Sequence, residues 1–147
     1  MIDDDLAPYA ASVLRVALGL MFLAHSIGLK LFVFGLPGTA QYFASLGLPW
    51  WLGYAVFSAE AVGGLLLVLG IQARWAALAL LPVVAGATWV HSGNGWMFAN
   101  EGGGWEYPLY LTVLSAAQFL LGDGRFAMVP SRRTNVLQRR GSGLTAA

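Results

Sequence analysis

Glu60 is the residue whose position most directly predicts chemistry, because it lies near the middle of the apolar segment 50–71. A carboxylate that deep in hydrocarbon costs about 2.5 kcal/mol or more on insertion scales. Such a group persists where it faces a partner, a cavity or a ligand. The sequence therefore predicts a polar site inside an apolar protein.

His25 is the first candidate partner for Glu60. If the outer ends of their segments lie near Phe34 and Trp51, each residue is about nine positions in, or roughly 13 Å at 1.5 Å per residue. A His–Glu pair at equal depth would titrate as a coupled unit and could relay protons. The alternative is a structural hydrogen bond that fixes helix register.

Lys30, His91 and Glu106 form a second group of ionisable residues near the outer boundary. Lys30 lies about 140° round an α-helix from His25, so both can face one cavity only if the helix distorts near Gly28. Otherwise Lys30 extends to the interface. His91 and Glu106 end and begin apolar segments, and Glu106 would also favour a helix N-terminus. We include all three with His25 and Glu60 as candidate ligand-binding or proton-relay residues.

The segment 92–106 contains three consecutive glycines and two tryptophans. Backbone N–H groups of Gly103 and Gly104 could face an anionic or carbonyl oxygen, although a glycine run equally makes a plain turn. Together with Trp96 and Trp105 they are predicted to line the pocket. An aromatic belt at the membrane interface explains most such tryptophans. Aromatic residues beside polar groups also suit a flat ligand such as a quinone head group.

Other cofactors fit the sequence less well. A haem needs two axial ligands at similar depth, whereas His25 and His91 differ in depth, so no haem is expected. The histidines and glutamates have no recognisable metal-ligand spacing, and no metal is expected. The absence of cysteine excludes disulfides and iron–sulfur clusters within the chain. A bound quinone is the expected ligand, with no covalent cofactor.

The elements that must position these residues are apolar helices. Of 147 residues, 58% are hydrophobic and 10% charged, against about 25% charged in soluble domains. Only helices satisfy their own backbone in lipid. We expect an all-α integral membrane four-helix bundle over residues 1–122, and a flexible cytoplasmic tail over residues 123–147. The expected spans are 10–34, 50–71, 75–91 and 105–121.

Basic residues predict the orientation. Seven arginines fall on the side of both termini and the turn near residue 72, and Lys30 alone falls toward the other side. The positive-inside rule therefore places both termini in the cytoplasm. The net charge of +1 offers no basic face for a nucleic-acid partner.

Several short motifs together resemble the DoxX family. They are Arg15 with His25 and Lys30, Gly47-Leu48-Pro49, Glu60-x-x-Gly63-Gly64, Gly70-x-x-x-Arg74, and the segment from His91 to Glu106. In many members Gly directly follows the histidine and Lys lies four positions after it. In this chain Ser26 follows His25, and Lys30 lies five positions after it. The resemblance implies a multi-pass protein of the bacterial inner (cytoplasmic) membrane. The family takes its name from a subunit associated with quinone-linked sulfur oxidation, some members are tied to oxidative-stress complexes, and most have no established activity.

Three functions remain open from the sequence. The first is a quinone-binding subunit of a membrane oxidoreductase, which needs a separate redox partner because this chain has no electron-carrying motif. The second is a membrane scaffold or assembly protein with no chemistry of its own. The third is a proton or small-solute transporter, for which four short spans would need a homo-oligomer. In each case the lipid bilayer is the immediate surroundings.

Overall fold

The computed structural model describes residues 3–132, and these are helical throughout their regular parts. No β-strand occurs in this part of the chain, apart from one isolated bridge between Ile71 and Val129. The prediction of an all-α protein is thereby confirmed for residues 3–132. The elements are α1 (Ala7–Leu23), η1 (Ala24–Val33), α2 (Leu36–Ser45), α3 (Trp51–Leu69), α4 (Ala73–His91), η2 (Ser92–Asn94) and α5 (Glu106–Leu121).

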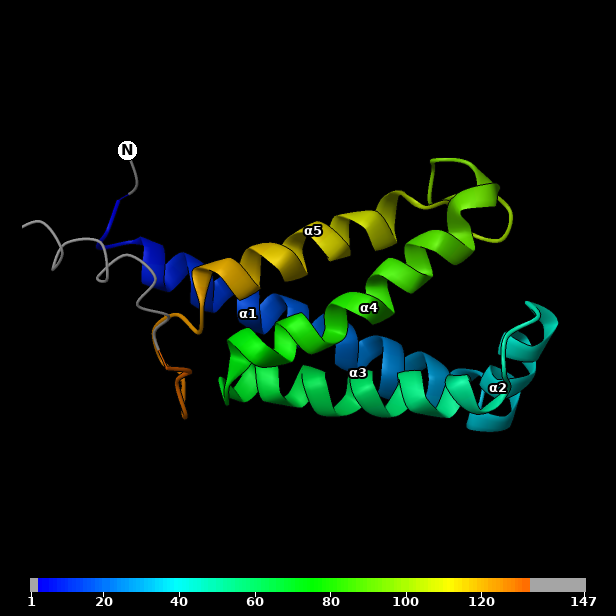
Figure 1. The fold of residues 1–147 in the computed structure, drawn as a ribbon, viewed down its shortest axis with the longest axis horizontal. Coiled ribbons are helices and arrows are strands. Elements are labelled where there is room, and N and C mark those ends of the chain that lie inside the picture. The colour runs from blue at the N-terminus through cyan, green and yellow to red at the C-terminus, as the bar shows by residue number, and fades with distance from the viewer. Residues whose placement is uncertain (1–2, 133–147) are drawn as a thin grey trace, which may run out of the picture.

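The long helices α1, α3, α4 and α5 pack side by side along the molecule (Figure 1). α1 contacts α3 and α5, α3 contacts α4, and α4 contacts α5. One end, which we call the turn end, holds the start of α1, the α3–α4 connection and the end of α5 (Figure 1). The opposite end, which we call the loop end, holds α2 and the α4–α5 connection.

Three of the described helical segments are long and apolar enough to cross a membrane. They are Ala7–Val33, Trp51–Leu69 and Ala73–Asn94, and they correspond to the first three predicted spans. The fourth predicted span forms α5, which has 16 residues and is about 24 Å long at 1.5 Å per residue. It packs with the others but is shorter than the roughly 20 residues that a typical span needs.

Small residues allow α1 and α3 to approach closely. A Cβ placed on Gly19 would lie 2.8 Å from the Gly64 carbonyl oxygen, and a Cβ on Gly64 would lie 3.0 Å from the Gly19 carbonyl oxygen. Glycine pairs of this kind bring membrane helices into backbone contact. The core beside them is formed by residues such as Phe22, Leu67 and Leu80, each at most 1% exposed.

The second half of the first apolar segment is not an α-helix. Residues Ala24–Val33 form a π-helix, whose hydrogen bonds include the one from Phe34 N–H to Leu29 O at 2.9 Å. The Ser26 hydroxyl donates to the Phe22 carbonyl at 2.9 Å. Ser side chains that bond back to the preceding turn bend helices, which favours a departure from α-helical geometry here.

Residues that follow α5 are fixed to the turn end of the bundle. Asp123 is buried and accepts hydrogen bonds from the Arg74 and Ser131 N–H groups at 3.0 and 2.7 Å. Arg15 is also buried and donates to the carbonyls of Leu67 and Phe126. Most of the predicted cytoplasmic tail, residues 133–147, lies outside the described residues.

Candidate functional site

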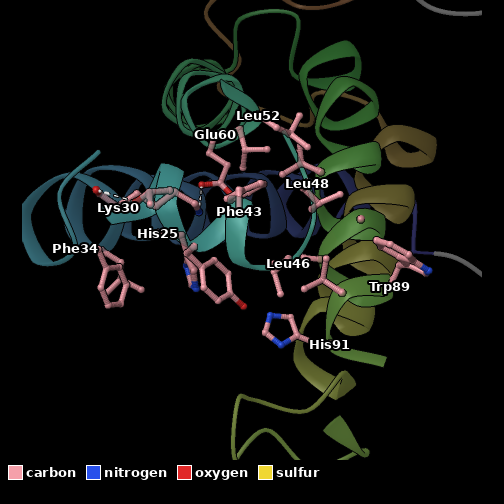
Figure 2. Close-up of a pocket in the computed structure, with 18 of the residues that line it drawn as sticks. His25, Lys30, Phe34, Phe43, Leu46, Leu48, Leu52, Glu60, Trp89 and His91 are labelled. Atoms are coloured by element: carbon pink, nitrogen blue, oxygen red, sulfur yellow. Dashed lines mark hydrogen bonds and ion pairs between the residues drawn. The ribbon is translucent and has the colours of Figure 1, made fainter. Parts of the chain in front are cut away.

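A cavity of about 740 Å³ opens between η1, α2, α3 and α4 near the loop end (Figure 2). Its walls are mainly apolar, with leucine, valine and phenylalanine side chains from all four elements. Its lysine, glutamate and histidine lining residues are His25, Lys30, Glu60 and His91. We call these four residues the polar cluster. Four of the five candidate ligand-binding residues therefore share one cavity.

An ion pair joins two members of the polar cluster. Lys30 Nζ donates to Glu60 Oε2 at 2.6 Å, and the two side chains are 18% and 9% exposed. A charge-assisted hydrogen bond of this length satisfies the buried carboxylate. The sequence left open whether Lys30 faces inward or extends to the interface, and the structure shows that it faces inward.

The π-helix explains why Lys30 and His25 can line the same cavity. Each π-helical hydrogen bond spans five residues, so residues five apart lie on nearly the same face. The 140° separation expected for an α-helix does not apply between His25 and Lys30. The distortion that the sequence required near Gly28 is therefore present, and single π-turns are frequent at functional sites.

His25 is held by its neighbours rather than by a direct bond to Glu60. Its Nδ1 lies 3.0 Å from the Met21 carbonyl oxygen, and its ring stacks on that of Tyr107 with centroids 5.7 Å apart. The direct partner of Glu60 is Lys30, although His25 is near enough to interact electrostatically with the carboxylate. Because a carbonyl only accepts, His25 Nδ1 is the donor in this contact, which leaves Nε2 as the ring nitrogen available to a ligand.

His91 ties the end of α4 to the glycine-rich part of the α4–α5 connection. Its Nδ1 lies 3.0 Å from the Gly102 oxygen and 3.1 Å from the Gly103 oxygen. The Asn94 amide donates to the same two carbonyls. His91 projects from α4 toward the side of the cavity where His25 lies (Figure 2). Since both carbonyls accept from Nδ1, the Nε2 atom of His91 is likewise the ring nitrogen available to a ligand.

Three predicted site residues lie outside the linings of both cavities described here. Glu106 accepts a hydrogen bond from the Phe98 N–H at 2.8 Å and so closes the loop onto the first turn of α5. Trp96 and Trp105 pack edge to face, with ring centroids 4.5 Å apart. These residues shape the connection instead of contacting the cavity, and the interfacial or capping alternative for Glu106 fits its contact.

Gly103 and Gly104 line a second, smaller cavity of about 210 Å³. It also contains all four members of the polar cluster, and Tyr107 from α5. A Cβ on Gly104 would lie within 2.2 Å of the Met97 carbonyl oxygen. Glycine is therefore needed there for close backbone packing, and the glycine run shapes the wall of this cavity.

Sequence reasoning missed the contribution of α2 and of Tyr107. Thr39, Tyr42 and Phe43 of α2 line the larger cavity, yet they lie between the first two predicted spans, and none of them is among the predicted site residues. Tyr107 stacks on His25 and had no signal beyond its place one residue after Glu106. Only the packing of distant elements reveals either contribution.

The polar cluster offers both donors and acceptors to a ligand in a mainly apolar cavity. The Lys30 ammonium is a donor, the Glu60 carboxylate is an acceptor, and each imidazole Nε2 accepts when its ring is neutral. Within the described residues, no group of three or more His, Cys, Asp or Glu side chains could hold a metal ion. The arrangement suits hydrogen bonding to an amphiphile with a polar head.

Long apolar helices, a buried ion pair and an internal cavity define a helical membrane protein with a ligand-sized site. The family model DoxX matches residues 10–93, and the chain belongs to the DoxX family. It is 40% identical over 62 residues to a Bacillus subtilis (strain 168) protein named "Putative oxidoreductase CatD". That match covers 42% of this chain and 44% of the relative. No solved structure matches the chain.

Proposed function

We propose that this chain is a quinone-binding subunit of a membrane oxidoreductase, and that the larger cavity holds the quinone. The observation that carries the proposal is that the polar cluster lines a mainly apolar cavity of about 740 Å³. A quinone has the matching form, with carbonyl oxygens on a flat ring and an apolar tail. The name of the Bacillus subtilis relative supports a redox role.

The cluster chemistry suits both redox forms of such a ligand. Lys30 can donate a hydrogen bond to a quinone carbonyl, and His25 or His91 Nε2 can accept one from a quinol hydroxyl. The Lys30–Glu60 contact keeps the two charges compensated when the cavity is empty of ligand. A separate redox protein must supply or remove the electrons, because the sequence contains no cysteine and only two histidines.

The cavity mouth is placed for entry from lipid. Five of its lining residues are large, apolar and exposed: Leu29, Phe34, Tyr42, Leu46 and Trp89. In a membrane these side chains would meet lipid or its interface, so a ligand dissolved in the bilayer could enter between α2 and α4. The proposal includes α5 as a fourth span, both termini in the cytoplasm, and a location in the bacterial inner membrane.

Mass spectrometry of the protein extracted in mild detergent tests this function, with an absorption spectrum of the same sample. We expect a retained quinone, and co-purification of an electron-transfer protein. Glu60→Gln and Lys30→Met variants should be folded but should retain much less quinone. A protein that carries only phospholipid, with or without these substitutions, would contradict the proposal and favour the scaffold function.

A further inference from the structure

The smaller cavity differs from the larger one in its position and its walls. Its volume is about 210 Å³, enough for several water molecules at ~30 Å³ each. Besides the polar cluster, it is lined by residues of α5 and of the α4–α5 connection, among them Phe98, Gly103 and Tyr107. The larger cavity has no lining residue from α5 or from the α4–α5 connection, and its last lining residue along the chain is His91 at the end of α4.

The polar cluster is the region that the two cavities share. Six residues line both: His25, Lys30, Glu60, Val83, Ala87 and His91. The Lys30–Glu60 ion pair therefore has space on two sides. One side leads along apolar walls to exposed aromatic residues, and the other leads to the glycine-rich connection at the loop end.

The walls on the second side can hold water. The side chains of His25, Lys30, Glu60, His91 and Tyr107 all line the smaller cavity, and a buried water needs two to four polar partners. The roof is formed by the loop around Gly103, whose neighbour Gly102 is exposed. Water could thus reach the ion pair without passing through the larger cavity.

We propose that the smaller cavity is a water-filled route through which protons pass between the loop-end surface and the Lys30–Glu60 pair. The inference rests on the proposed function only for the use of those protons. A quinone reduced to quinol takes up two electrons and two protons; the separate redox protein supplies the electrons, and this route supplies the protons.

The titratable groups along this route are His25 and Lys30 of η1, Glu60 of α3, His91 of α4 and Tyr107 of α5. Glu106 is bonded to the loop backbone and lies outside it.

Single cysteines test this route directly, because the natural chain contains none. Leu111 lines only the smaller cavity, Leu52 lines only the larger, and Leu67 is fully buried and lines neither. Each is replaced by Cys in the full chain reconstituted in lipid nanodiscs. The variants are treated with a small charged methanethiosulfonate and, separately, with an apolar maleimide.

We expect the charged reagent to modify Leu111→Cys on the order of tenfold faster than Leu52→Cys, because thiolates form and react in water. The apolar maleimide should prefer Leu52→Cys, and Leu67→Cys should resist both reagents. If Leu111→Cys does not fold, Met21→Cys serves instead, because Met21 also lines only the smaller cavity.

The aqueous route would be overturned if the charged reagent modified Leu111→Cys and Met21→Cys no faster than it modifies Leu67→Cys. The labelling needs no quinone, so that outcome leaves the proposed function standing. Rapid labelling of Leu111→Cys in a protein that retains no quinone would refute the proposed function alone.

Discussion

At the scale of single residues, substitutions in the Lys30–Glu60 pair can distinguish a structural role from a ligand-binding role. Both side chains are mostly buried and joined at 2.6 Å. Removing one partner of a buried pair leaves an uncompensated charge, whereas replacing both with apolar residues is often neutral. Stability and ligand binding should therefore respond differently to single and double substitutions.

We expect Lys30→Met to lower the free energy of unfolding by about 3 kcal/mol. The double variant Lys30→Met, Glu60→Met should recover most of that loss, because no charge stays buried alone. Thermal unfolding in detergent measures the stability, and quinone content measures the binding. The double variant should be stable but without quinone. A stable double variant that still retains quinone would show that the pair serves packing alone.

The sequence predicted these residues better than it predicted their pairing. The cost of a charge in hydrocarbon singled out Glu60, and depth placed His25 near it. The direct partner is instead Lys30, because the helix that carries it is a π-helix over Ala24–Val33. The α-helical angle between His25 and Lys30 assumed a geometry that this segment does not have.

At the scale of elements, α4 forms one wall of the larger cavity and offers a way to fill it. A Cβ at Gly86 has no atom within 4 Å, and Gly86 lines the cavity. A larger side chain there would occupy ligand space without a clash. The adjacent Ala85 is exposed and lines neither cavity, so it provides a matched control on the same helix.

We expect Gly86→Leu to abolish quinone retention, whereas Ala85→Leu should retain the wild-type amount. Neither variant should unfold at a lower temperature. Leucine forms helix better than glycine does, and less well than alanine by only about a few tenths of a kcal/mol. Quinone content per protein, measured by mass spectrometry after extraction, checks this expectation. Equal loss or equal retention in the two variants would argue against the cavity as the binding site.

The contact between α1 and α3 predicts a different kind of change. Gly19→Ala would place a methyl group 2.8 Å from the Gly64 carbonyl oxygen and from the Val68 nitrogen. Overpacking of this kind costs about 1–3 kcal/mol, so the unfolding temperature should fall. Gly86→Ala, with open space at its Cβ, should not lower it, because alanine forms helix better than glycine. An unaltered unfolding temperature in Gly19→Ala would show that the two helices can separate at little cost.

Helix positions were easier to predict than the loop end. Apolar runs and turn residues located α1, α3, α4 and α5 to within a few residues. The role of α2 in the cavity wall and the closure of the loop by Glu106 depend on contacts between distant segments. A hydrophobic pattern carries no record of such contacts.

At the scale of the whole molecule, one end of the bundle holds buried and basic side chains with the returning chain, and the other end holds the cavities. Arg15, Arg74 and the segment after α5 lie toward the turn end, where that segment also packs against the α3–α4 connection through the Ile71–Val129 bridge. Arg15 is buried rather than exposed, and it connects α1 to α3 and to the segment after α5 through the Leu67 and Phe126 carbonyls. Both cavities lie toward the loop end.

The orientation of these ends is testable by cysteine labelling in intact cells. Glu101 lies in the loop-end connection and Asp4 lies before α1, and both are exposed. If the termini are cytoplasmic, a membrane-impermeant thiol reagent should label Glu101→Cys in intact cells and Asp4→Cys only after the membrane is disrupted. The reverse pattern would invert the orientation and place the cavities on the cytoplasmic side.

The central claim, that the larger cavity binds a quinone, is tested most directly by photolabelling. The purified chain in nanodiscs is irradiated with a short-tailed photoreactive quinone, and the modified residues are mapped by mass spectrometry. We predict modification at cavity residues such as Leu52, Val56 and Val90, suppressed by excess natural quinone and absent in Gly86→Leu. Modification spread over the lipid-facing surfaces, insensitive to competitor and to Gly86→Leu, would contradict the claim.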